Sequence, residues 1–133
     1  MSDLTQLEQE LMKMLLDGDD PVLVVLREQL RVATVLERKM TGAGFYTDFS
    51  VSPIAPRCVE HLSFEIADLI ARLKGAEHGA GFVLFIREGQ LKMLEGFTFD
   101  EPWPDQITEY KLSYVKGQRD WNEVRQKLHG TKP

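Results

Sequence analysis

The chain has 133 residues, which suits one domain, and 43% of them are hydrophobic, enough for a single core. Asp and Glu number 21 against 16 Lys and Arg, so the net charge at neutral pH is −5. This balance argues against a general nucleic-acid binder, which needs a basic patch, and against an anionic membrane surface as partner.

Cys58 is the single cysteine, so no intrachain disulfide forms, and a reducing compartment is expected. The first residues are acidic where a signal peptide is positively charged, and no apolar run approaches the roughly 18 residues of a membrane span. We therefore expect a cytoplasmic protein. Cys58 is interpreted as an apolar filler rather than a nucleophile, because nothing visible orients His61 as its base.

Two helices are predicted at the start of the chain. Leucines and methionines recur at spacings of three and four over residues 3–17, as on one face of an amphipathic helix. Gly18 ends this helix, Asp19 or Asp20 caps the next one, and Pro21 occupies its first turn. The second helix is predicted to run to about Lys39, so residues 1–40 form an antiparallel helical hairpin.

Residues 41–116 are predicted to form an antiparallel sheet of four or five strands. Residues 45–51 alternate apolar and polar side chains, as in a half-buried strand. The clearest hairpin joins residues 82–87 to residues 90–99 through a tight turn with glycine in second position. A further strand is predicted over residues 107–115.

Residues 62–74 fit a helix or a strand, because their apolar positions satisfy both periods in part. The neighbouring strands favour a strand, which is the prediction adopted. The glycine-rich residues 75–81 are predicted to be a flexible turn. Residues 117–133 are predicted to hold a short helix, capped by Asp120, and a tail.

Together these elements predict a single α+β domain: a helical hairpin on one face of a twisted antiparallel sheet, with a short C-terminal helix. In the predicted register of the long hairpin, Leu84 faces Met93 and Phe82 faces Glu95. The apolar side chains on this predicted face should pack against the helices, and they are Phe82, Leu84, Ile86, Leu91, Met93, Phe97 and Phe99.

Glu95 is the leading candidate binding residue, because alternation places it on the predicted apolar face between Met93 and Phe97. An unpaired buried carboxylate is costly, so it must be paired, be protonated or line a cavity. One interpretation is a polar anchor in a small-molecule pocket. The other is a structural carboxylate that reaches solvent or bonds a backbone or tyrosine group.

Three other residues are candidate binding residues. Trp103 lies between two prolines, a position that suits a partner hot spot, a pocket wall or a cap on the core. His78 sits among glycines on the predicted turn, and Asp48 lies on the polar side of its strand. The three histidines follow no metal spacing, and the aspartates at 17, 19 and 20 lack the closing glutamate of a calcium loop. No catalytic residue, metal or cofactor is predicted.

Residues 15–23, 26–30, 41–49, 79–85 and 94–104 resemble segments of a family of small uncharacterised bacterial proteins. The resemblance covers most of residues 10–105 and implies a bacterial origin and a fold of two helices plus an antiparallel sheet. It also favours a strand over residues 62–74, and it implies no catalytic residue. Residues 94–104 are in addition similar to parts of immunity proteins of bacterial toxin systems.

Hypotheses of different classes follow for the function. The favoured one is a non-enzymatic protein-interaction module, immunity-like in that its acidic charge steers it to a basic toxin. The alternative is a small-ligand-binding domain, or an unrecognised enzyme, with a pocket around Glu95. The third hypothesis is a homodimer formed on a sheet edge or a helix face. Its basis is the wide apolar arc of the predicted second helix, which a monomer would not cover on every side.

Overall fold

The computed structural model describes residues 4–57 and 62–129, and Cys58 and His61 lie outside these ranges. The described helices are α1 (Gln6–Leu15), α2 (Pro21–Arg31) and α3 (Trp121–His129). The described strands are β1 (Ala33–Met40), β2 (Gly44–Val51), β3 (Phe64–Leu73), β4 (Ala76–Arg87), β5 (Gln90–Thr98) and β6 (Tyr110–Tyr114). The predicted α+β class is confirmed, with six strands in these residues rather than four or five.

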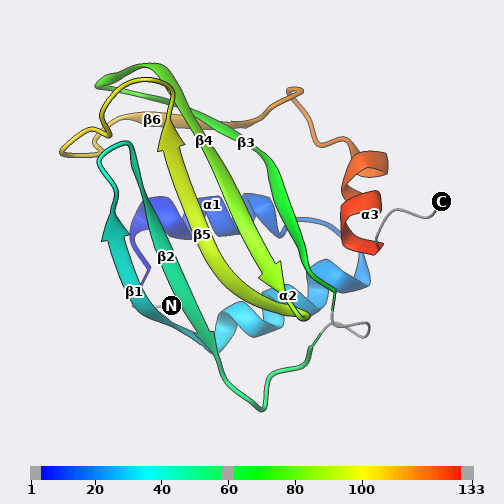
Figure 1. The fold of residues 1–133 in the computed structure, drawn as a ribbon. Coiled ribbons are helices and arrows are strands. Elements are labelled where there is room, and N and C mark those ends of the chain that lie inside the picture. The colour runs from blue at the N-terminus through cyan, green and yellow to red at the C-terminus, as the bar shows by residue number, and fades with distance from the viewer. Residues whose placement is uncertain (1–3, 58–61, 130–133) are drawn as a thin grey trace.

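The strands form one antiparallel sheet in the order β1-β2-β5-β4-β3-β6. Helices α1 and α2 pack on the same face of it, α1 against β3 and α2 against β5, and they lie behind the strands in Figure 1. Helix α3 packs beside β3 near the edge of the sheet. Within the described residues no helix covers the opposite face, which we call the open face.

Local signals in the sequence fix the starts of the first two helices. Thr5 and Glu8 form a reciprocal capping box at the start of α1, each side chain accepting a hydrogen bond from the other's backbone N–H. Of the two predicted caps, Asp19 and Asp20, it is Asp20 that caps α2: its carboxylate accepts the Val22 N–H at 2.9 Å, and Pro21 occupies the first turn.

The predicted length of the second helix is wrong. Helix α2 ends at Arg31, and the next residues form β1 instead of two further turns. Val32 and Leu36, which seemed to continue the helical stripe, are 44% and 66% exposed. Pairing with β2 overrides the helical period here, because the β-branched side chains of Thr34 and Val35 favour a strand. The helical part of residues 1–40 is therefore shorter than predicted.

The ambiguous segment 62–74 is a strand, as predicted, because β3 pairs with β4 on one side and with β6 on the other. The prediction of a flexible turn over residues 75–81 is wrong, since β4 already begins at Ala76. The register between β3 and β4 shifts between Ala71 and Leu73, and this irregularity accommodates the glycine-rich start of β4.

A second register shift, between Phe85 and Ile86, changes the predicted faces of the long hairpin. Beyond it Leu84 pairs with Leu94 and Phe82 pairs with Gly96, one position away from the prediction. The buried residues of β5 that face the helices are Leu91, Leu94, Gly96 and Thr98. Met93, Glu95 and Phe97 therefore lie on the open face, and their predicted packing against the helices is wrong.

Two arginines hold the C-terminal end of α1 by hydrogen bonds to backbone carbonyls that the helix leaves unpaired. Arg119 donates to the carbonyls of Leu15 and Asp17 and forms an ion pair with Asp68 of β3 at 2.8 Å. Arg27 of α2 donates to the carbonyls of Leu16 and Gly18 at 2.6 and 2.8 Å. The end of α1 is thus joined to β3, to α2 and to the segment before α3.

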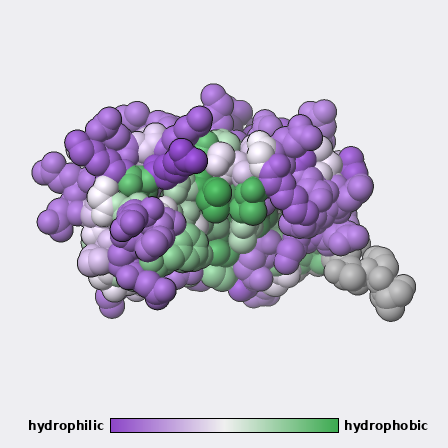
Figure 2. Space-filling model, turned by 90° about the horizontal axis from the view of Figure 1, so that it is seen from above, coloured by the Kyte–Doolittle hydropathy of each residue, from purple (hydrophilic) through white to green (hydrophobic). Residues whose placement is uncertain are grey.

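Hydrophilic residues cover most of the surface seen from above in Figure 2, and hydrophobic residues show in a central patch. Among the described residues no helix is long and apolar enough to cross a membrane.

We expect Gly18→Ala to destabilise the fold by about 2–3 kcal/mol, because two costs add at this position. Gly18 has φ +139°, and a Cβ placed on it would lie 2.3 Å from the Trp121 ring, which packs against this glycine from α3. Urea unfolding measures the difference. Gly117→Ala is the control, since Gly117 has φ +83° but open space around it, so it isolates the backbone strain. Equal losses in the two variants would contradict the role of the Trp121 contact.

Candidate functional site

The open face carries apolar side chains from neighbouring strands in the middle of the sheet. Ile70 of β3 and Phe99, just after β5, are 37% and 44% exposed. Others are half-buried, and they are Tyr46 of β2, Val83 and Phe85 of β4, and Met93 and Phe97 of β5. Scattered apolar residues are normal on a surface, but a contiguous group on adjacent strands makes this face a candidate interaction site.

The aromatic part of this face is built on a glycine. The rings of Phe97 and Phe99 meet edge to face, with centroids 5.5 Å apart. Both lie across Gly81 of β4, where a Cβ would come within 2.9 Å of the Phe97 ring. Because Gly81 has no side chain, the two rings lie low on the sheet and form a broad apolar surface.

Two of the predicted binding residues, Asp48 and Glu95, come together on the open face. Glu95 pairs across strands with Tyr46, and Asp48 pairs with Met93, so the two carboxylates are diagonal neighbours on β2 and β5. Both are half-buried. Within the described residues neither carboxylate has a hydrogen bond or an ion pair. By contrast, Glu65 at the border of the same face pairs with Arg87 at 2.7 Å.

The third predicted residue, Trp103, closes one end of the core. It is 8% exposed, its ring meets Phe45 edge to face at 5.3 Å, and its backbone N–H donates to the Gly42 carbonyl at 2.8 Å. Trp103 also forms part of the wall of a small cavity. Trp103 is therefore a core residue at the edge of this cavity.

The fourth, His78, is exposed at the start of β4, whereas Glu95 pairs with Val83 further along that strand. The backbone N–H groups of Glu77 and His78 donate to the Glu101 carboxylate at 2.9 and 2.6 Å. The hydrogen bond from His78 is the main reason that the pKa of Glu101 is lowered. These contacts fasten the loop after β5 to β4 and leave the His78 ring outside the Asp48–Glu95 pair.

A buried ion pair that the sequence reading missed lies beside the Trp103 cavity. Glu8 of α1 is 2% exposed, and it accepts two hydrogen bonds from Arg38 of β1 and one from Thr47 of β2, at 2.5–2.8 Å. The spacing Thr5-x-x-Glu8 is a capping-box signature, and it is the sequence feature that points to a structural role for Glu8. It could not identify Arg38 as the partner, because the predicted second helix extended over that residue.

The electrostatic state of Glu8 follows from these contacts. Burial raises the pKa of its carboxyl, but the hydrogen bonds from Arg38, Thr47 and Thr5 and the positive charge of Arg38 lower it more. The net result is a pKa below the usual 4.5. Glu8 is therefore ionised at neutral pH and balances the charge of Arg38.

The cavity beside this ion pair has a volume of about 370 Å³. It lies between the first turn of α1, the end of β1 and the loop that follows β5. Its apolar wall includes Met40, Phe45, Trp103, Ile107 and Tyr110.

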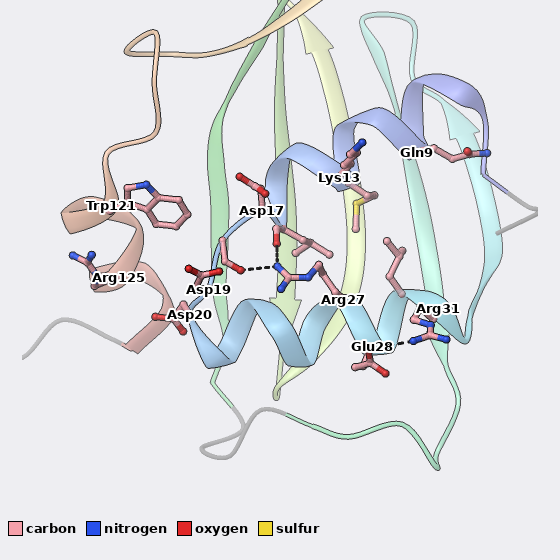
Figure 3. A pocket seen from close by; sticks show the side chains of 14 residues that line it. Gln9, Lys13, Asp17, Asp19, Asp20, Arg27, Glu28, Arg31, Trp121 and Arg125 are labelled. Atoms are coloured by element: carbon pink, nitrogen blue, oxygen red, sulfur yellow. Dashed lines mark hydrogen bonds and ion pairs between the residues drawn. The ribbon is translucent and has the colours of Figure 1, made fainter.

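A larger cleft of about 1140 Å³ separates α1 from α2 and reaches α3 (Figure 3). Arg27 extends across it from α2 to the end of α1, and Trp121 stands at the side formed by α3. Its rim carries both signs of charge, with Lys13 and Arg125 as well as Asp17. Because both signs of charge are present, the rim favours neither an anionic nor a cationic ligand.

No family model matches the chain, and no curated protein or solved structure matches it either. Within the described residues no group of three or more histidine, cysteine, aspartate or glutamate side chains could hold a metal ion.

We expect Glu8→Gln to lower the free energy of unfolding at neutral pH by about 2 kcal/mol, because it removes the carboxylate charge from the buried ion pair with Arg38. The wild type should lose this advantage as the pH falls below 4.5, since a lowered pKa stabilises the fold above the unfolded value. Urea unfolding of both proteins at neutral pH and below pH 4.5 measures the effect. Glu28→Gln, at an exposed pair with Arg31, is the control. A difference in the free energy of unfolding between wild type and Glu8→Gln that is the same at both pH values would contradict this account.

Proposed function

We propose that this protein is a non-enzymatic protein-interaction module that binds a basic protein through its open face. The observation that carries the proposal is the pairing of an apolar surface with two carboxylates that have no partner in the described residues. Apolar side chains such as Met93 and Phe97 supply the area that is removed from water. Asp48 and Glu95 supply the charge that a lysine or arginine of the partner would meet.

Charge complementarity favours a basic partner over a neutral one. The net charge of −5 attracts a positively charged protein from a distance and raises the rate of encounter. At contact, an unpaired carboxylate against an uncharged partner would lose its hydration without compensation. A basic partner avoids this loss at both Asp48 and Glu95.

A basic bacterial toxin is one partner with this chemistry, and the immunity-like interpretation of the sequence belongs here. The segment that resembles immunity proteins, residues 94–104, includes Glu95, Phe97 and Phe99 of the open face. The resemblance supports a protective role against such a toxin. The partner itself, once identified, decides between this role and another.

The alternative function, a ligand pocket around Glu95, has weaker support. It required Glu95 to lie between the sheet and the helices, and the register of β4 and β5 places this residue on the open face instead. A second copy of the chain is also a weaker candidate partner, because it would bring its own Asp48 and Glu95 to the same acidic surface.

We expect Asp48→Lys combined with Glu95→Lys to weaken partner binding about a hundredfold, because attraction becomes repulsion at the contact. The measurement is paired affinity capture from bacterial lysate with wild type and variant, followed by titration calorimetry with the recovered partner at low and high salt. Binding by the wild type should weaken as salt rises, because salt screens the attraction between the charges.

Glu28→Lys combined with Asp19→Lys is the matched control, because it makes the same change in charge on the helical side of the molecule. This control should lower the rate of association slightly and leave the complex intact. A partner that binds the open-face variant as well as the wild type would refute the proposed surface. Recovery of the chain alone, as a dimer that the open-face variant dissociates, would refute the basic partner.

A further inference from the structure

We propose that the cavity beside Trp103 is a binding site for a small uncharged aromatic molecule that carries a hydrogen-bond acceptor. This inference is independent of the proposed protein partner, because the cavity does not use the open face. Its walls come from α1, β1, β2, the loop after β5 and the start of β6. The proposed ligand chemistry follows from the volume of the cavity, its wall residues and their charge.

The volume of about 370 Å³ sets the size of the ligand. An engineered apolar cavity of about 150 Å³ in another protein accommodates benzene. A cavity more than twice as large suits a bicyclic ring system. Ligand sites of this size are usually lined by apolar and aromatic side chains with a few polar groups that fix orientation.

The walls favour an aromatic ligand. Phe45 and Trp103 hold each other in an edge-to-face pair, so one side of the cavity is rigid. Tyr110 and Ile107 lie on the wall as well, and Met40, which is 59% exposed, adds an adaptable thioether. An exposed methionine beside aromatic rings loses its contact with water when an apolar ligand covers it.

One polar group in the wall lacks a partner. The indole N–H of Trp103 donates to no group within the described residues, although the residue is only 8% exposed. Every side-chain N or O atom that is fully buried there has a hydrogen-bond partner, so this N–H is reached by solvent. A carbonyl oxygen on the ligand that accepts a hydrogen bond from this N–H would fix the ligand's orientation.

The charge beside the cavity favours an uncharged ligand. Glu8 and Arg38 both line it, and their opposite charges balance in a bidentate pair, while the remaining charged residue of the lining, Asp105, is exposed to solvent. A charged ligand would have to give up its hydration next to a pair that is already neutral overall, which is costly. An uncharged ligand carries no such penalty.

The test uses coumarin, a neutral bicyclic lactone with a carbonyl acceptor, and coumarin-3-carboxylate as its charged analogue. Binding is followed by backbone and indole ¹H–¹⁵N shifts of the full chain, which has two tryptophans, Trp103 and Trp121. We expect saturable shifts of the Trp103 indole signal with coumarin and binding about tenfold weaker with the carboxylate. Shifts confined to Trp121, no saturable binding, or equal affinity for both probes would overturn the proposal.

Variants then locate the site. Ile107→Trp fills the cavity and should weaken coumarin binding about tenfold, and Met40→Trp at the exposed rim should act in the same direction. Ile54→Trp is the matched control, because it adds the same indole at an isoleucine that is 89% exposed on another loop. Trp103→Phe keeps an aromatic ring and removes the donor, so it should weaken binding about fivefold. Unchanged affinity in the two filled variants, with both of them folded, would overturn the proposed site.

Discussion

The register shift between Phe85 and Ile86 decides what each face of this molecule shows to its surroundings. In a regular strand, residues three apart point to opposite faces, yet Leu91 and Leu94 are both buried on the helical side. The additional residue in β5 makes this possible, and it sends Glu95 and Phe97 to the other side. A hairpin without the shift would place Glu95 among the core leucines, where a carboxylate without a partner is strongly unfavourable.

The open face exists because the chain provides two layers rather than three. Helices α1 and α2 are both used on one side of the sheet, and the hydrogen bonds of Arg119 and Arg27 hold the end of α1 there. Helix α3 is fastened beside β3 by Trp121, which packs on Gly18. These contacts place every helix of the described chain on one side or at the edge of the sheet, so the surface of Phe97 and Phe99 is covered by no helix of these residues.

Local patterns predicted those parts of the structure that local chemistry decides. The cap at Asp20, the strand over residues 45–51 and the class of the fold are of this kind. Predictions from local patterns were wrong where pairing with a strand distant in the sequence determines the structure. Val32 and Leu36 fit a helical stripe, but pairing with β2 makes Leu36 part of an edge strand. Asp48 and Glu95 were each singled out, yet only the pairing of β2 with β5 makes them neighbours.

The two proposed sites differ in whether their carboxylates are paired with a positive charge of the same chain. Beside the Trp103 cavity, Arg38 balances the charge of Glu8 and Thr47 donates a further hydrogen bond to it, so this pair presents no net charge to a ligand. On the open face, Asp48 and Glu95 have no such ion pair within the described residues, and we propose that a basic partner neutralises them. Strand β2 contributes to both, with Phe45 and Thr47 on its helical side and Tyr46 and Asp48 on its open side. Its alternation therefore lets one short strand present an uncharged site and an acidic one, back to back.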